Sequence, residues 1–246
     1  MAFPEPTPQI VKELAPTGVL RAAINVSNGL LVTGRTPTDD PTGVSPSMAA
    51  AIAEHLGVPV RYLKYAKPDQ IAEDGGLGKW DIGNIGAEPQ RAAKISFTAA
   101  YAEIEATYLV PPGSSIRSIE DVDKPGVRII VSKGAAYDHW LSRNIKHATL
   151  LHGEGGDKAF DMFVQDKLDA YAGLRPGLLS SVKKLPGARI LDGNFTSVQQ
   201  AVGTAKTNEA GFRFLRDFVE EAKRSGLVAK FIAQHGVEGL SVAKPA

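Results

Sequence analysis

The chain has 246 residues, of which 43% are hydrophobic and 22% are charged, a balance typical of a folded globular protein. Its formal charge is only +1, so no long-range field attracts nucleic acid or an anionic membrane. Cysteine is absent, which excludes disulfides, thiolate metal sites and cysteine nucleophiles.

Residues 1–9 are rich in proline and contain no apolar run. A secretion signal requires such a run, so we expect either a cytoplasmic protein or an exported one whose signal has been removed. The longest apolar stretches of the chain have the length of strands, whereas a membrane-spanning helix needs about 20 apolar residues. We therefore expect no insertion into a membrane.

The first half of the chain alternates between apolar strands and amphipathic helices. A buried strand is predicted over 19–26, and a loop rich in Thr, Asp, Pro and Gly follows over 33–46. Met48 begins an apolar stripe with four-residue spacing that indicates a helix, and either Ser45 or Ser47 is expected to cap it. Further strands are predicted over 58–63, 80–85 and 104–110.

The second half repeats this alternation. Strands are predicted over 127–131 and 169–173, and helices over 137–145, 157–168, 208–226 and 227–235. Strands that alternate with helices along the whole chain favour parallel α/β layers.

Several stretches of the chain carry a family pattern and occur in the family's order. They are GVLRAA at 18–23, residues 43–60 ending in AEHLGVPV, KWDI at 79–82, EPQR at 88–91, ISFTAAY at 95–101, KLDA at 167–170, and RSGL at 224–227 with Phe231-Ile232. Together they resemble family 3 of the extracellular solute-binding proteins, which serve amino-acid ABC transporters.

The resemblance implies an α/β, two-lobed type II periplasmic-binding-protein fold, in which each lobe is a sheet flanked by helices. Lobe 1 would comprise residues 1–103 and 199–246, and lobe 2 would be a central insertion over 104–198. Two hinge crossings would let the lobes close over a small carboxylate-bearing ligand. The expected partner is an ABC-transporter permease, or a sensor if the chain is cytoplasmic. We expect a monomer that needs no cofactor.

Arg91 matches the family arginine that holds the ligand's carboxylate. A guanidinium can donate two parallel, charge-assisted hydrogen bonds to one carboxylate. The alternative is an exposed arginine in the first turn of a helix. Upstream, the family segment that faces the ligand corresponds to Asn84, Ile85 and Gly86, with glycine where threonine is usual.

Other candidate ligand contacts follow the ends of predicted strands. Asn25 and Asn28 come after the first strand and are equally well explained as turn residues. In lobe 2, Gly134, Ala135, Ala136 and Tyr137 match the family's turn at a helix start, where backbone N–H groups can bind an anion, and Ser132 or Lys133 can reach in from the strand end. The alternative is an ordinary strand-to-helix connection.

The main departure from the family pattern lies after Asp169-Ala170. The family aspartate that pairs with the α-amino group of an amino acid corresponds to Leu174 here, and Arg175 follows. A leucine cannot compensate an ammonium group. The sequence therefore favours a carboxylate without an amine, or a second anionic group that Arg175 answers. Glu103 or Glu105 at the hinge is an alternative partner for an amine, and Arg175 could instead be a surface residue.

A few relatives of this fold are dehydratases, so a cyclohexadienyl-dehydratase-like lyase is the alternative function. Such an enzyme needs a general acid or base beside the substrate. None of the five histidines falls in a matched binding turn, so we predict no catalytic residue and no metal site. A further alternative is a relative that has lost its ligand because its site has decayed.

Overall fold

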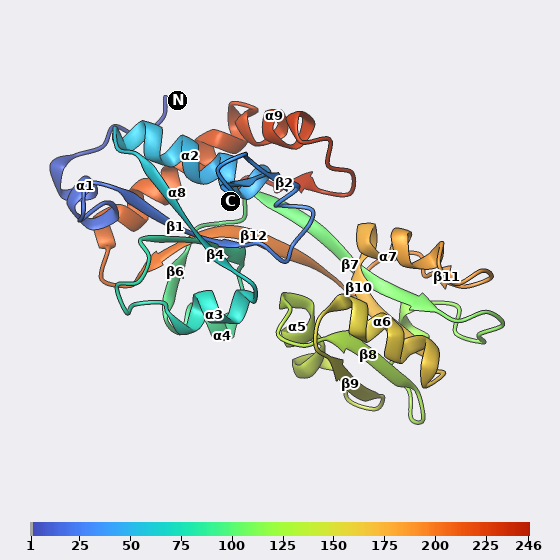
Figure 1. Cartoon of the computed structure of the whole chain (residues 1–246). Helices are drawn as coiled ribbons and strands as arrows, with labels where there is room; N and C mark the ends of the chain where they lie inside the picture. Colours follow the sequence, from blue (N-terminus) through green and yellow to red (C-terminus); the bar gives the residue numbers. More distant parts are fainter. Residues whose placement is uncertain (1) are drawn as a thin grey trace. The chain divides into compact units, whose positions relative to one another are not determined.

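The computed structural model describes residues 2–246, which form a mixture of helices and strands and confirm the predicted α/β class (Figure 1). Two compact units are present. Unit 1 comprises Met1–Glu103 and Gln199–Ala246, and unit 2 comprises Ile104–Val198.

The sheet of unit 1 is built around three parallel strands. β1 (Leu20–Asn25) pairs in parallel with β4 (Val60–Tyr65) on one side and with β5 (Ile82–Gly86) on the other. The 199–205 part of β12 (Thr196–Ala205) then pairs with β5 in the antiparallel direction, and β6 (Ile95–Phe97) pairs with β12. Finally, β13 (Ser241–Val242) pairs with the first residues of β7 (Ala102–Val110). The carboxyl ends of β1, β4 and β5 consequently share one edge of the sheet.

Helices cover both faces of this sheet. The helices of unit 1 are α1 (Pro8–Leu14), α2 (Val44–Leu56), α3 (Pro68–Glu73), α4 (Pro89–Ala92), α8 (Glu209–Arg224) and α9 (Leu227–Gln234). α2 lies on one face of the sheet and α3 on the other (Figure 1). On the α3 face, Ile71 and Trp80 pack against Ile85, and the indole Nε1 donates to the carbonyl of Ile71 at 3.0 Å.

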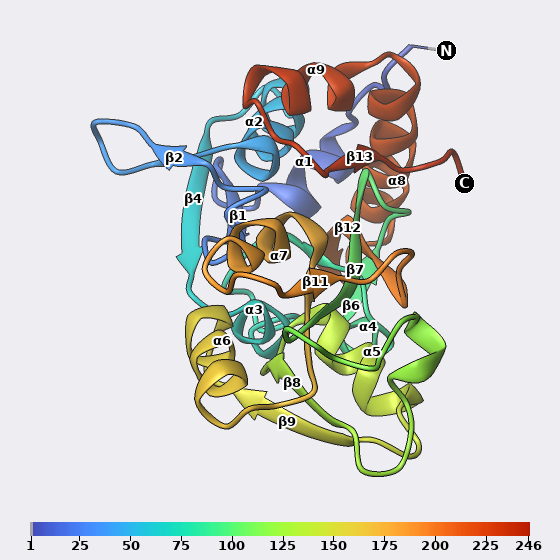
Figure 2. The same cartoon turned by 90° about the vertical axis from the view of Figure 1, so that its right-hand side faces the viewer.

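The predicted loop over 33–46 contains more structure than expected. A short hairpin of β2 (Gly34–Arg35) and β3 (Pro41–Thr42) occupies most of it, and Figure 2 shows this hairpin extending from unit 1. The prediction that Ser45 or Ser47 caps α2 is wrong, because the cap position belongs to Gly43. The hydroxyl of Ser45 instead pairs with the Tyr101 hydroxyl at 2.8 Å.

The strands of unit 2 carry an apolar core on each face. β8 (Arg128–Ser132) pairs in parallel with β9 (Thr149–Gly153) and β10 (Ala170–Leu174). β7 pairs with β10 in the antiparallel direction, and β11 (Arg189–Ile190) pairs antiparallel with β7. The helices are α5 (Ala136–Asn144), α6 (Gly156–Gln165) and α7 (Arg175–Val182), with the short 3-10 turn η1 (Ile119–Asp121). Leu141 of α5 packs on one face of the sheet, and Phe163 of α6 and Leu178 of α7 pack on the other.

Candidate functional site

Arg91 is a buried arginine, with only 3% of its surface exposed. This burial rules out the alternative of an exposed arginine in a first helical turn. Its Nε and Nη2 donate to Asp69 Oδ1 at 3.2 and 3.0 Å, and Nη1 donates to the carbonyl of Gly86 at 2.8 Å. Burial lowers the pKa of Arg91, and the carboxylates of Asp69 and Glu88 oppose this shift. A guanidinium stays protonated in proteins, so the buried group is a cation held by an anion.

The strand register explains why Arg91 meets Asp69, which lies 22 residues earlier in the chain. α3 follows β4 and α4 follows β5, and both strands run parallel to β1. The two helices therefore start at the same edge of the sheet. Each begins with a proline, Pro68 or Pro89, which suits the first helical position because it has no N–H to leave unpaired. Asp69 then lies in the first turn of α3, close to Arg91 in α4.

Asp69 was not among the residues that the sequence pointed to. None of the stretches that carry the family pattern contains it. The usable signal was positional, because Pro68-Asp69 follows the end of β4 much as Pro89-Gln90-Arg91 follows the end of β5. Parallel strands that flank a common neighbour bring such segments to one edge, which is where ligands bind in open α/β sheets.

Asn25 is the last residue of β1 and Asn28 follows three positions later, at this same edge. Asn25 Oδ1 accepts from Ser27, from the hydroxyl at 2.6 Å and the backbone N–H at 3.2 Å. Asn28 Oδ1 accepts from the Leu30 N–H at 3.1 Å. Both side chains thus form the local bonds of turn residues. A role in ligand binding for either remains a proposal.

The three residues from Asn84 to Gly86 lie in three different environments. Asn84 is only 1% exposed and lies beneath α2, where its Nδ2 donates to the carbonyl of Ser45 at 3.2 Å. Within residues 2–246, no group hydrogen-bonds to its buried Oδ1. Ile85 belongs to the apolar core on the α3 face. Gly86 is the member of the segment that contacts Arg91, through its backbone carbonyl.

In unit 2, the predicted turn after β8 has an internal partner. Gly134 has the left-handed φ of 75° that favours glycine, and Ala135 is the cap residue of α5. The Gly134 N–H donates at 2.8 Å to Oδ2 of Asp138, a buried acid in the first turn of α5. Asp138 Oδ1 also accepts from Ser142 and His152, at 3.2 and 2.9 Å. The Asp138 carboxylate therefore holds the turn in place through its hydrogen bond to the Gly134 N–H.

The other candidates around this turn are buried or half-buried. Ala136 is the first residue of α5, and Ser132 is the last residue of β8. Tyr137 packs against the core that contains Leu141, and burial raises the pKa of its hydroxyl. The sequence did not single out Asp138 or His152, because an acid in a first helical turn is common and the strand that carries His152 was not predicted.

Leu174 and Arg175 stand at the junction of β10 and α7. Arg175 Nε donates to Glu105 Oε2 at 2.7 Å, and its Nη2 also contacts the carbonyls of Leu191 and Gly193. Arg175 was considered for a second anionic group of the ligand, and Glu105 for its amine. These two residues instead form an ion pair with each other within unit 2.

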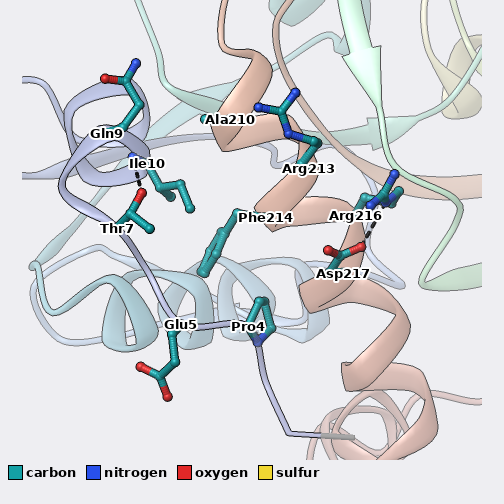
Figure 3. Close-up of a pocket in the computed structure, with 10 residues that line it drawn as sticks. All are labelled: Pro4, Glu5, Thr7, Gln9, Ile10, Ala210, Arg213, Phe214, Arg216 and Asp217. Atoms are coloured by element: carbon teal, nitrogen blue, oxygen red, sulfur yellow. Dashed lines mark hydrogen bonds and ion pairs between the residues drawn. The ribbon is translucent and has the colours of Figure 1, made fainter.

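Unit 1 also contains a hollow of about 440 Å³ on different elements (Figure 3). The N-terminal segment and α8 line it, and Ile10 and Phe214 point toward each other across it. Arg213 and Arg216 stand on the α8 side, where Arg216 pairs with Asp217 at 2.8 Å. None of the residues matched to the family's ligand contacts lines this hollow.

Metal-binding clusters and membrane-spanning helices are both absent from residues 2–246. No group of three or more His, Asp or Glu side chains there is placed to hold a metal ion. No helix within the same residues has the length and apolar character needed to cross a membrane.

Comparison with known proteins gives a consistent result. The L-cystine-binding protein TcyJ of Escherichia coli K12 is 24% identical over 190 residues, which cover 75% of this chain and 70% of that protein. The solute receptor for L-cysteine of Neisseria gonorrhoeae matches with a TM-score of 0.76 and 19% identity, over 95% of this chain and 99% of that one.

A reconstructed ancestral protein is also similar. The amino acid-binding protein AncCDT-1, described as a precursor of cyclohexadienyl dehydratase, matches with a TM-score of 0.72 and 23% identity, over 91% of this chain and 98% of that one. These likenesses confirm the predicted type II periplasmic-binding-protein fold. The model of the bacterial extracellular solute-binding proteins, family 3, matches residues 32–238. The chain therefore belongs to family 3 of the bacterial extracellular solute-binding proteins.

Proposed function

We propose that this protein binds a small carboxylate-bearing solute through Arg91 and presents it to an ABC-type transporter. The observation that carries the proposal is the burial of this cation at the edge where β1, β4 and β5 end. Burying a charge is costly, and the bonds to Asp69 and Gly86 hold the guanidinium in one orientation. An oriented guanidinium is suited to bidentate recognition of a carboxylate.

An amino acid is the leading candidate among carboxylate-bearing solutes. TcyJ is named for L-cystine and the Neisseria receptor for L-cysteine, and both are relatives of this chain. A transporter partner is proposed on the same ground, since another solved relative is described as a binding component of an ABC transporter, complexed with lysine.

Binding without catalysis is also part of the proposal. The histidines of unit 1 make structural contacts away from Arg91. The ring of His55 packs against Phe3 and Phe218, and His235 Nε2 hydrogen-bonds to the Ser47 hydroxyl at 2.9 Å. A dehydratase remains the second candidate, because AncCDT-1 is described as a precursor of such an enzyme.

The proposal can be tested by thermal-shift and calorimetric titration with amino acids, monocarboxylates and dicarboxylates. A ligand present at about 100 times its Kd stabilises the native state by about 2.7 kcal/mol. Arg91→Ala should lose this stabilisation, and Arg91→Lys should retain only part of it, because an ammonium lacks the planar fork. Arg61→Ala is the matched control, since Arg61 is an exposed arginine on β4 of the same unit.

Full stabilisation of Arg91→Ala by the best wild-type ligand would remove Arg91 from the site. Consumption of a cyclohexadienyl substrate by the wild-type protein would instead establish the dehydratase.

A further inference from the structure

We propose that Asn28 is a site of spontaneous deamidation, at which the backbone nitrogen of Gly29 attacks the side-chain amide. Asn28 is the only asparagine in the chain that is followed by glycine, because the others precede Val, Ile, Phe or Glu. Glycine has no Cβ atom, so its nitrogen reaches a neighbouring group over a wide range of backbone angles. The modification changes the chain itself and needs no bound solute.

The reaction has two steps and consumes one molecule of water. In the first step the Gly29 nitrogen gives its proton to a solvent base and bonds to Asn28 Cγ, while the side-chain nitrogen takes up a proton and leaves as ammonia. The product is a succinimide ring. In the second step water opens this ring. Opening at the side-chain carbonyl gives aspartate, and opening at the backbone carbonyl gives isoaspartate, in which the main chain runs through Cγ.

The first support is that the attacking and leaving groups are both unbonded. Gly29 is exposed, and within residues 2–246 its backbone N–H has no hydrogen-bond partner. In the same part of the chain, no group accepts a hydrogen bond from Asn28 Nδ2. Attack by the Gly29 nitrogen and departure of ammonia therefore break no hydrogen bond of the folded protein.

The second support is the hydrogen bond to the amide carbonyl. Asn28 Oδ1 accepts from the Leu30 N–H at 3.1 Å. Negative charge develops on this oxygen when a nitrogen attacks Cγ, and a donor that already points at the oxygen stabilises that charge. The same bond folds the Asn28 side chain back along the backbone, which keeps Cγ close to the Gly29 nitrogen.

The two products should differ in their effect on the fold. Aspartate keeps the backbone, and its carboxylate can still accept from the Leu30 N–H. Isoaspartate lengthens the main chain and turns the backbone carbonyl that accepts from Leu31 and Val32, at 3.0 and 2.9 Å, into a free carboxylate branch. Leu31 is buried, and its own carbonyl accepts from the Ser45 N–H at 3.1 Å in the first turn of α2. Isoaspartate should therefore loosen the start of α2.

Ageing of the purified protein tests the proposal. The folded protein is incubated at mildly alkaline pH and digested at mildly acidic pH, which limits further deamidation. Mass spectrometry follows the peptide that contains Asn28, and protein isoaspartyl methyltransferase detects isoaspartate. Asn194, an exposed asparagine followed by Phe195, is the control site in the same digest. We expect Asn28 to be converted about tenfold faster or more, because a side chain on the next residue hinders attack by its nitrogen.

Gly29→Ala is the informative variant. A Cβ atom at Gly29 would have nothing within 4 Å, and the residue has no positive φ, so the fold should be retained. The substitution should slow the conversion of Asn28 about tenfold or more, because alanine adopts a narrower range of backbone angles. Gly177→Ala is the matched control, since Gly177 has equal space and no positive φ, and it should leave the rate unchanged. Thermal melting reports whether each variant is folded.

Three results would overturn the site. They are equal conversion of Asn28 and Asn194, an unchanged rate in a folded Gly29→Ala variant, and conversion of Asn28 only after the protein is unfolded in urea, which would mean that the turn protects it. The effect on α2 has its own readout. Asn28→Asp reproduces the aspartyl product and should melt like the wild type, whereas aged protein rich in isoaspartate should melt at a lower temperature. Equal melting of aged and fresh protein would contradict the effect on α2.

Discussion

Arg175 and Glu105 form an ion pair within unit 2, with Arg175 Nε 2.7 Å from Glu105 Oε2. The same guanidinium bonds to the carbonyls of Leu191 and Gly193, and so ties the start of α7 to the segment that leads into β12. These contacts give Arg175 a structural role that needs no ligand.

The first prediction concerns this ion pair. Arg175→Ala should lower the free energy of unfolding by about 1 kcal/mol, because it removes hydrogen bonds to two carbonyls as well as a partly exposed ion pair. Glu105→Gln should change it by less than about 0.5 kcal/mol, since the Glu105 side chain is 55% exposed. Urea denaturation measures both values. An Arg175→Ala variant of wild-type stability that binds carboxylates more weakly would show that Arg175 contacts the ligand.

The second prediction concerns the turn after β8. Asp138 accepts from the Gly134 N–H, the Ser142 hydroxyl and His152 Nε2, and it is buried. Asp138→Ala should therefore destabilise the protein by about 1–3 kcal/mol, because its partners lose their acceptor. Asp161→Asn, at an exposed position in α6, should have little effect in the same urea titration. Equal stability of the two variants would contradict the assigned role of Asp138.

The third prediction concerns acid denaturation. The pKa of Asp121 falls from 3.8 to about 2, first because Lys124 hydrogen-bonds to its carboxylate and then because the backbone N–H groups of Arg117 and Ser118 do so. The folded state binds this proton less readily than the unfolded state. The stabilisation from the charged carboxylate is therefore complete above about pH 4 and is lost as the pH falls toward about 2.

Asp121→Asn checks this pH dependence. The variant should lose less stability than the wild type between about pH 4 and pH 2, because the titrating group is gone. Urea midpoints measured across this range provide the comparison. Parallel wild-type and variant curves would mean that Asp121 titrates alike in the folded and unfolded chains.

The fourth prediction compares two glycines at the two ends of α2. Gly43 has a φ of 142°, and a Cβ atom there would lie 2.3 Å from the carbonyl oxygen of Leu31. Gly57 has a φ of 69°, and a Cβ atom there would have nothing within 4 Å. Gly57→Ala should therefore cost about 1–2 kcal/mol, the penalty for the left-handed backbone alone. Gly43→Ala should cost about 3 kcal/mol or more, because the backbone must also shift. Equal unfolding free energies would contradict the steric assignment.

Long elements with strong periodicity could be predicted from the sequence. The helix expected between Asn208 and Gly226 is α8 (Glu209–Arg224), whose apolar stripe recurs every three or four residues. By contrast, β9 (Thr149–Gly153) was missed, because it is short and only its last residue is buried, so it has no clear alternation. The cap of α2 was misassigned because Ser45 and Ser47 find partners far along the chain, at Tyr101 and His235.

The amino-acid sequence by itself determined the α/β class and the order of its longer strands and helices, because periodicity and turn residues act over a few neighbouring positions. It also marked Arg91, through the family pattern at 88–91. Only the tertiary structure decided which charges meet. Asp69 reaches Arg91 because β4 and β5 both pair with β1, and Glu105 reaches Arg175 because β7 pairs with β10. Both ion pairs are set by strand order and register. Strand order and register depend on packing between segments that are far apart in the sequence, which local sequence patterns do not predict.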